Sequence, residues 1–193
     1  MANDLNGKRV AFLATDGVEQ VELTEPWAAV EDAGGRPELL GPKRGRIQAV
    51  KGMDKADTFE VTRTSADASP SEFDGLVIPG GVKNPDKMRM DRPSVDFVRS
   101  FVASGKPTAV ICHGPWMLVE ADVVRGRTVT SYPSLQTDIR NAGGTWVDEE
   151  VHVDRGLVTS RTPDDLPAFC AKLVEEIAEG VHARQPVGAA AGR

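Results

Sequence analysis

A cysteine followed directly by a histidine is the pair most capable of chemistry in this chain. Cys112 and His113 end an apolar run, 108–111, and Gly114-Pro115 follows them. The run predicts a buried strand, and a proline in this place predicts a helix start. A sharp turn from strand to helix directs the junction residue out of the sheet, and the free amides of the helix start favour a thiolate. We expect Cys112 to be a nucleophile; the alternative is a buried, inert cysteine.

A pair of glycines marks a second place of interest. Residues 73–79 predict another central strand, and Gly80 and Gly81 follow Pro79 at its carboxyl end. Glycines in this position indicate that the backbone approaches a ligand closely or adopts a positive φ. Gly80 and Gly81 are therefore candidates for a position close to a bound ligand.

Several other chemistries are disfavoured by the same residues. Gly80-Gly81 lacks the Gly-Lys-Ser/Thr continuation of a phosphate-binding loop. Val110 stands where the elbow of a serine hydrolase needs glycine. His152 and His182 share no metal-ligand spacing with His113, so we expect no metal site and no cofactor.

The elements that must position these residues alternate between strands and helices. Strands are expected near residues 8–15, 37–40, 73–79, 108–112, 127–130 and 157–160, with helices near 18–32, 93–104, 134–142 and 163–180. Short strands at 47–50 and 58–61 predict a hairpin after the basic turn 42–46, which we interpret as a solvated turn rather than an anion site. The pattern predicts an α/β sandwich with a mainly parallel sheet.

Length and composition are those of one globular domain. The chain has 193 residues, of which 40% are hydrophobic and 27% charged, with a net charge of −6. The negative charge argues against nucleic acid as the main partner, and two cysteines make no disulfide framework. The sequence contains no apparent signal peptide and no run long enough to span a membrane. We expect a cytoplasmic domain over 1–180 and a mobile tail over 181–193.

The motifs together resemble the ThiJ/PfpI superfamily, in particular its intracellular-protease-I branch. The resemblance spans about residues 8–178 and lies in these segments: 18–23 (VEQVEL), 76–81 (LVIPGG), 111–115 (ICHGP), 124–127 (VRGR), 130–133 (TSYP) and 159–161 (TSR). It implies a flavodoxin-like three-layer α/β/α sandwich, similar to class I glutamine amidotransferases.

The resemblance also implies roles for individual residues. Cys112 would be the nucleophile, and His113 an adjacent acid/base or orienting group. Glu19 would hydrogen-bond the sulfur. The Gly81 and His113 amides would form an oxyanion site, with Gly80 beside them.

An acidic residue donated across a subunit interface is a further feature of some relatives. Asp86 is the candidate here, with a slightly different spacing, and it would reach the histidine of a neighbouring subunit. The resemblance therefore implies a homodimer or a higher homo-oligomer.

Electrostatics restricts what Glu19 can do. An ionised carboxylate beside sulfur raises the thiol pKa, so the glutamate assists a thiolate only when it is protonated and donates its hydrogen. Burial and the adjacent sulfur would raise its pKa, and the two groups would titrate as a pair. The alternative for Glu19 is a solvated residue in the first turn of a helix.

Three functions fit such a site. The first is a stress-protective glyoxalase or deglycase, which acts on small reactive carbonyls or on modified protein side chains through a thiol adduct. The second is an intracellular cysteine peptidase. The third is a redox sensor in which Cys112 is oxidised reversibly. A small recessed pocket would favour the first function and an extended groove the second; we expect the first, within a general stress-protective role.

Overall fold

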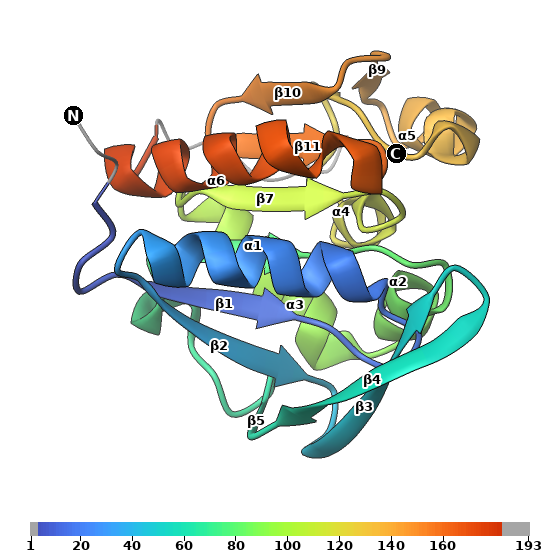
Figure 1. The fold of residues 1–193 in the computed structure, drawn as a ribbon. Coiled ribbons are helices and arrows are strands. Elements are labelled where there is room, and N and C mark those ends of the chain that lie inside the picture. The colour runs from blue at the N-terminus through green and yellow to red at the C-terminus, as the bar shows by residue number, and fades with distance from the viewer. Residues whose placement is uncertain (1–3, 183–193) are drawn as a thin grey trace.

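A seven-stranded sheet forms the centre of the protein in the computed structural model, which describes residues 4–182 (Figure 1). Its order is β10-β11-β7-β6-β1-β2-β5, and every pair is parallel except β10–β11. The strands are β1 (Arg9–Leu13), β2 (Arg36–Gly41), β5 (Arg63–Thr64), β6 (Gly75–Ile78), β7 (Thr108–Ile111), β10 (Val151–Asp154) and β11 (Leu157–Ser160). The expected mainly parallel sheet is confirmed.

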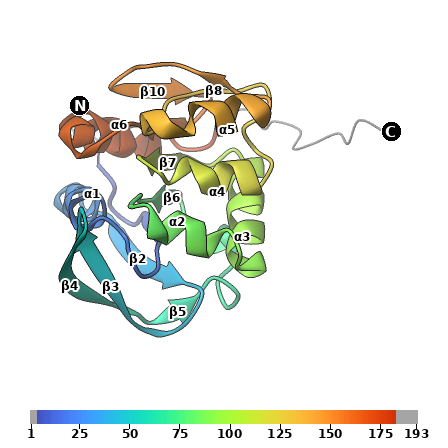
Figure 2. The same ribbon diagram turned by 90° about the vertical axis from the view of Figure 1, so that its right-hand side faces the viewer.

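Helices cover both faces of this sheet. One face carries α1 (Gln20–Asp32) and α6 (Leu166–Glu179), and the other carries α2 (Lys83–Met88), α3 (Arg92–Ala103) and α4 (Pro115–Glu120), with α5 (Gln136–Asn141) beside α4 (Figure 2). The expected three-layer α/β/α sandwich is therefore confirmed.

Strand β1 shows why its sequence is apolar without interruption. Val10 and Phe12 are buried in the cluster that includes residues of α1 and α6. Ala11 and Leu13 are buried in the cluster on the opposite face, with residues of α3 and α4. Because successive side chains of a strand point to opposite faces, a strand covered on both sides needs apolar residues at every position.

A hairpin leaves the sheet and reaches the carboxyl edge of the parallel strands. It consists of β3 (Gly45–Lys51) and β4 (Asp54–Val61), and both strands are longer than expected. The loop before α1 is bonded to it, because the Gly17 amide donates to Gln48 O at 2.8 Å and the Val50 amide donates to Val18 O at 2.8 Å. A small second pair is formed by β8 (Thr128–Val129) and β9 (Thr145–Trp146).

The ends of the chain complete the description. No helix within residues 4–182 has the length and apolar character needed to cross a membrane. Of the expected tail over 181–193, residues 183–193 lie outside the described part. The His182 amide, at its start, donates to Gly105 O at 2.8 Å.

Candidate active site

Cys112 lies at a strained turn between β7 and α4. Its φ is +61°, in the left-handed region, and its own amide donates to Ser160 O at 3.0 Å. This conformation costs a non-glycine residue about 1–3 kcal/mol, and it persists only where the surroundings impose it. A Cβ on Gly114 would lie 2.7 Å from Ile78 O, so glycine is needed for the chain to turn here. The expected strand-to-helix elbow is present, and Cys112 is 7% exposed.

Glu22, rather than Glu19, is the acid beside the sulfur. Glu22 lies in the first turn of α1 and is fully buried. Its Oε2 accepts a hydrogen bond from the Gly80 amide at 2.7 Å, and its carboxylate lies close enough to the Cys112 thiol for the two groups to shift each other's pKa. A Cβ on Gly80 would lie 2.6 Å from Glu22 Oε2 and 2.7 Å from Cys112 Cβ. Glycine at position 80 therefore allows the acid and the cysteine to meet.

Glu19 has a different place, so the expectation that it hydrogen-bonds the sulfur is wrong. Its Oε2 accepts from the Gly52 amide at 3.0 Å, at the tip of the β3–β4 hairpin. Glu19 lines the cavity above Cys112 and forms a backbone bridge with Val50. The physical reason is the position of each residue relative to α1. Glu22 lies on the buried face of the helix with Pro26 and Val30, whereas Glu19 precedes the helix.

The spacing of the apolar residues in α1 could have identified Glu22 from the sequence. Residues 22, 26 and 30 are spaced by four and form the stripe that packs on the sheet. A glutamate in register with such a stripe is buried, and a buried carboxylate needs a partner.

Two backbone amides act on the sulfur. The amides of Gly81 and His113 lie near Cys112 and lower the pKa of its thiol. Gly81 has a φ of +77°, and a Cβ there would lie 2.3 Å from Gly17 O. These are the two amides expected in an oxyanion site. The Gly80 amide is engaged with Glu22, so Gly80 positions the acid instead of donating to a substrate.

The protonation state of Cys112 and that of Glu22 depend on each other. Burial raises the pKa of the Cys112 thiol above its ordinary value, the charge of Glu22 adds to the increase, and the Gly81 and His113 amides lower it. Burial likewise raises the pKa of Glu22 to about 7, although the hydrogen bond from the Gly80 amide lowers it. The expected field favouring a thiolate is therefore absent while Glu22 is ionised. A protonated Glu22 no longer repels the sulfur and can donate to it.

His113 lies directly beside the sulfur. Its Nδ1 is 3.2 Å from Cys112 Sγ. The imidazole stacks on Tyr132 at 4.6 Å between ring centroids and meets the edge of Trp116 at 5.3 Å. Burial lowers the pKa of His113, which favours the neutral ring at pH 7. A neutral imidazole at this distance can accept or deliver a proton at sulfur or at a bound substrate.

Asp86 lies apart from this group within the subunit. Its Oδ1 accepts from Arg89 Nη2 at 2.7 Å, and the Arg89 guanidinium lies 5.0 Å from the centroid of the Trp116 ring. The side chain of Asp86 is about half exposed. The described chain thus brings Cys112 and His113 together and leaves Asp86 on the surface.

A cavity of about 430 Å³ opens above the sulfur. Its size is that of a pocket for a small molecule. Tyr132 and the hairpin tip form part of its wall, and the full lining is Gly17, Glu19, Glu22, Val50, Gly52, Met53, Gly81, Val82, Lys83, Cys112, His113, Tyr132 and Pro163.

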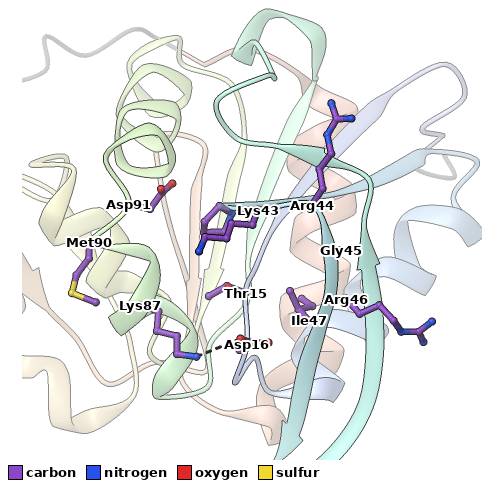
Figure 3. A pocket seen from close by; sticks show the side chains of 11 residues that line it. Thr15, Asp16, Lys43, Arg44, Gly45, Arg46, Ile47, Lys87, Met90 and Asp91 are labelled. Carbon is purple, nitrogen blue, oxygen red and sulfur yellow. Dashed lines mark hydrogen bonds and ion pairs between the residues drawn. The ribbon is translucent and has the colours of Figure 1, made fainter.

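A second cavity, of about 490 Å³, lies at the basic turn and shares no lining residue with the first (Figure 3). Lys43 projects into it, whereas Arg44 and Arg46 point outward and bond Asp67 and Thr58. Lys87 lies 3.5 Å from Asp16 across its mouth. The basic turn therefore spreads its charges over the surface and does not gather them around one anion.

Cys170 and Arg161, two further side chains capable of chemistry, lie outside this site. Cys170 is half-buried, and burial, reinforced by the charge of Glu25, raises its pKa to about 12, as expected for an inert thiol. Arg161 is paired with Asp165 at 2.9 Å and with Asp148 at 2.8 Å. Neither residue lines the cavity above Cys112.

Comparison with known proteins identifies the family of this chain. The sequence model of the DJ-1/PfpI family matches residues 8–176. An Escherichia coli (strain K12) protein named protein/nucleic acid deglycase 2 is 44% identical over 163 residues, which are 84% of this chain and 93% of that protein. A Bacillus subtilis (strain 168) protein, YraA, named as a candidate cysteine protease, is 40% identical over 162 residues, covering 84% of this chain and 94% of that protein.

A solved structure extends the comparison to three dimensions. It is a two-domain protein of Anabaena variabilis that contains a DJ-1/ThiJ/PfpI-like domain and a ferritin-like domain. The TM-score is 0.83 at 36% identity, and the match covers 88% of this chain and 48% of that chain. On the family match, the two relatives and this fold, the chain belongs to the DJ-1/PfpI family.

Proposed function

We propose that this protein is a stress-protective enzyme that uses Cys112 as a nucleophile against reactive carbonyls or the adducts they form on proteins. One observation carries the proposal. Cys112 lines a cavity of about 430 Å³ together with the Glu22 carboxyl, and His113 Nδ1 lies 3.2 Å from its sulfur. The relative named as a deglycase supports the same substrate class.

The reaction begins at the sulfur. The Cys112 thiolate adds to the aldehyde carbon of an α-oxoaldehyde, and the carbonyl oxygen, which gains negative charge, accepts hydrogen bonds from the Gly81 and His113 amides. Glu22 is neutral in this state and holds the proton that the thiol has lost. The oxygen then takes up a proton, which gives a hemithioacetal on Cys112.

A proton transfer and a hydrolysis complete the cycle. A base removes the proton from the former aldehyde carbon, and the neighbouring ketone carbon receives a proton, which converts the adduct to a thioester of a 2-hydroxy acid. Water attacks the thioester, the carbon–sulfur bond breaks, and the acid leaves while the sulfur regains its starting state. His113 is placed to move these protons. Methylglyoxal and water would thus give lactate.

The experiment compares the wild-type protein with Cys112→Ser, and uses Cys170→Ser as the matched control. Lactate formation from methylglyoxal is measured beside the loss of a preformed methylglyoxal adduct of N-acetylcysteine, with a trap for free aldehyde present in one arm. We expect Cys112→Ser to lose both activities and Cys170→Ser to keep them. With the trap present, adduct loss that is faster than the spontaneous release of aldehyde identifies a deglycase. Adduct loss that is no faster than this release identifies an enzyme that acts on the free aldehyde. Equal rates in wild type and Cys112→Ser would overturn the proposal.

Peptidase activity is the second candidate, supported by the relative named as a candidate cysteine protease. The same proteins are therefore assayed with a panel of peptides, and Cys112-dependent cleavage without carbonyl turnover would favour that function. Stable oxidation of Cys112 with no turnover of either substrate would favour a redox sensor. A cytoplasmic location and assembly into a homodimer belong to the same proposal.

A further inference from the structure

Three potential metal ligands converge at the end of the sheet opposite to Cys112. Glu176 and Glu179 lie in the last turn of α6, and His182 follows three residues after Glu179. One ligand atom from each residue lies within 4.8 Å of the other two. The spacing of three residues places the two carboxylates on one side of the helix end.

Two of these ligand atoms are buried and lack hydrogen-bond partners among the described residues. The side chain of Glu176 is only 8% exposed, and its Oε2 lies 3.0 Å from His182 Nε2. The two atoms are within ion-pair distance, but neither meets the angular requirement of a hydrogen bond with any residue in the described part of the chain. A buried carboxylate oxygen without a hydrogen bond is costly, and a buried polar group in this state points to a missing partner.

The imidazole is held in place by two glycine turns. The His182 amide donates to Gly105 O at 2.8 Å, and the ring packs on Gly156, where a Cβ would lie 2.5 Å from His182 Cδ2. Gly105 and Gly156 have φ values of +76° and +78°. These turns lead into β7 and β11, so His182 is fixed against the amino ends of two central strands.

We propose that Glu176, Glu179 and His182 bind a divalent transition-metal ion of the zinc class. Carboxylate oxygen and imidazole nitrogen ligate zinc at about 2.0–2.2 Å in tetrahedral geometry, so adjacent ligand atoms of one ion lie about 3.3–3.6 Å apart. Glu176 Oε2 and His182 Nε2 are 3.0 Å apart, so the two side chains need to separate by only a few tenths of an ångström to hold an ion. Glu179 is exposed, and its side chain can rotate to complete the set of three.

The surrounding charges are consistent with a cation at this position. The carboxylates of Glu179 and Glu175 add negative charge around Glu176, and His182 and Lys172 oppose it. Lys172 is the neighbouring cation, and its Nζ is bound to Glu175 at 2.7 Å. A bound ion would neutralise the two clustered carboxylates.

The ion would have a structural role. It would link the end of α6 to the turns that precede β7 and β11, at the edge of the sheet away from the cysteine, which follows β7. The proposal is therefore independent of the reaction at Cys112.

Calorimetric titration with Zn²⁺ tests the proposal, with Cys112→Ser as the parent protein to remove the reactive thiol. We expect one ion per chain, and an affinity that falls by at least about tenfold in Glu179→Gln and His182→Ala. His152→Ala is the matched control, because His152 is paired with Glu149 at 2.7 Å elsewhere on the surface, and it should bind like the parent. Glu179 is exposed, so its variant should fold normally.

Two further measurements distinguish this site from zinc binding elsewhere on the protein. Co²⁺ bound at this site should give no sulfur-to-metal charge-transfer band, because its ligands are oxygen and nitrogen. Zn²⁺ should raise the melting temperature of the parent and not that of His182→Ala. Absence of binding, or equal binding by the parent and His182→Ala, would show that Glu176 and His182 form only an ion pair and would overturn the proposal.

Discussion

Glu22 and Cys112 come from elements far apart in the sequence and meet over Gly80. The Gly80 amide holds Glu22 Oε2 at 2.7 Å beside Cys112, and the charge of the carboxylate raises the pKa of the thiol. Glu22 is fully buried and Cys112 is 7% exposed, so water screens little of their interaction. The protonation of this pair determines when the sulfur can react.

The first prediction concerns the pH dependence of stability. The pKa of Glu22 is raised from 4.5 to about 7 on folding, so the folded state binds the proton more tightly. The stabilisation is fully present below pH 4.5 and is lost as the pH rises through 7. It amounts to about 3 kcal/mol. The side chain in Glu22→Gln does not titrate. Urea titrations at several pH values therefore give the difference in unfolding free energy between wild type and Glu22→Gln, and this difference should fall by about this amount between the two pKa values. A constant difference would contradict the raised pKa.

The second prediction separates the role of His113 from that of the nucleophile. Because Nδ1 lies 3.2 Å from the sulfur, we expect His113→Gln to lower carbonyl turnover by about 10²–10⁴-fold through loss of proton transfer. Alkylation of Cys112 by iodoacetamide needs no such transfer and should change far less. His152→Gln is the control for a histidine outside the site. An equal loss of turnover and alkylation would indicate that His113 only supports the fold around the sulfur.

The third prediction concerns Asp86, which bonds Arg89 within its own subunit. If it completes the site of a neighbour in a symmetric dimer, Asp86→Ala and Cys112→Ser subunits will each be inactive alone. Mixed dimers would contain one intact site, so a random mixture should recover about a quarter of wild-type activity. Turnover after co-refolding of the two variants measures this. An active Asp86→Ala protein, or a mixture without recovery, would exclude the role.

Much of the fold follows from local patterns in the sequence. The uninterrupted apolar residues of 108–111 and 75–78 identify central strands covered on both faces, and the Cys-His-Gly-Pro segment identifies the elbow. The position of Cys112 at the carboxyl end of β7 is predictable because strand, turn and helix are adjacent in the chain.

The identity of the acid depends on information that a motif does not contain. Glu19 and Glu22 have the same side chain, and only the rotation of α1 against the sheet decides which one is buried. Glu22 shares the buried face with Pro26 and Val30, and Glu19 instead binds the hairpin tip at Gly52. The expected lowering of the thiol pKa is wrong for a related reason, because desolvation and the charge of Glu22 together exceed the effect of the Gly81 and His113 amides.

The most direct test of the role of Glu22 is the pH dependence of Cys112 alkylation in wild type, Glu22→Gln and Glu22→Ala, followed by mass spectrometry of the Cys112 peptide. Glu19→Gln is the matched control, since Glu19 lines the same cavity but does not bond the sulfur. We predict that wild type and Glu19→Gln have the same pH dependence, that Glu22→Gln needs a higher pH, and that Glu22→Ala needs the highest, because only a protonated glutamate donates its hydrogen to the sulfur. If both Glu22 variants instead react at lower pH than wild type, the carboxylate only repels the thiolate, and its role as a proton-holding partner of Cys112 is contradicted.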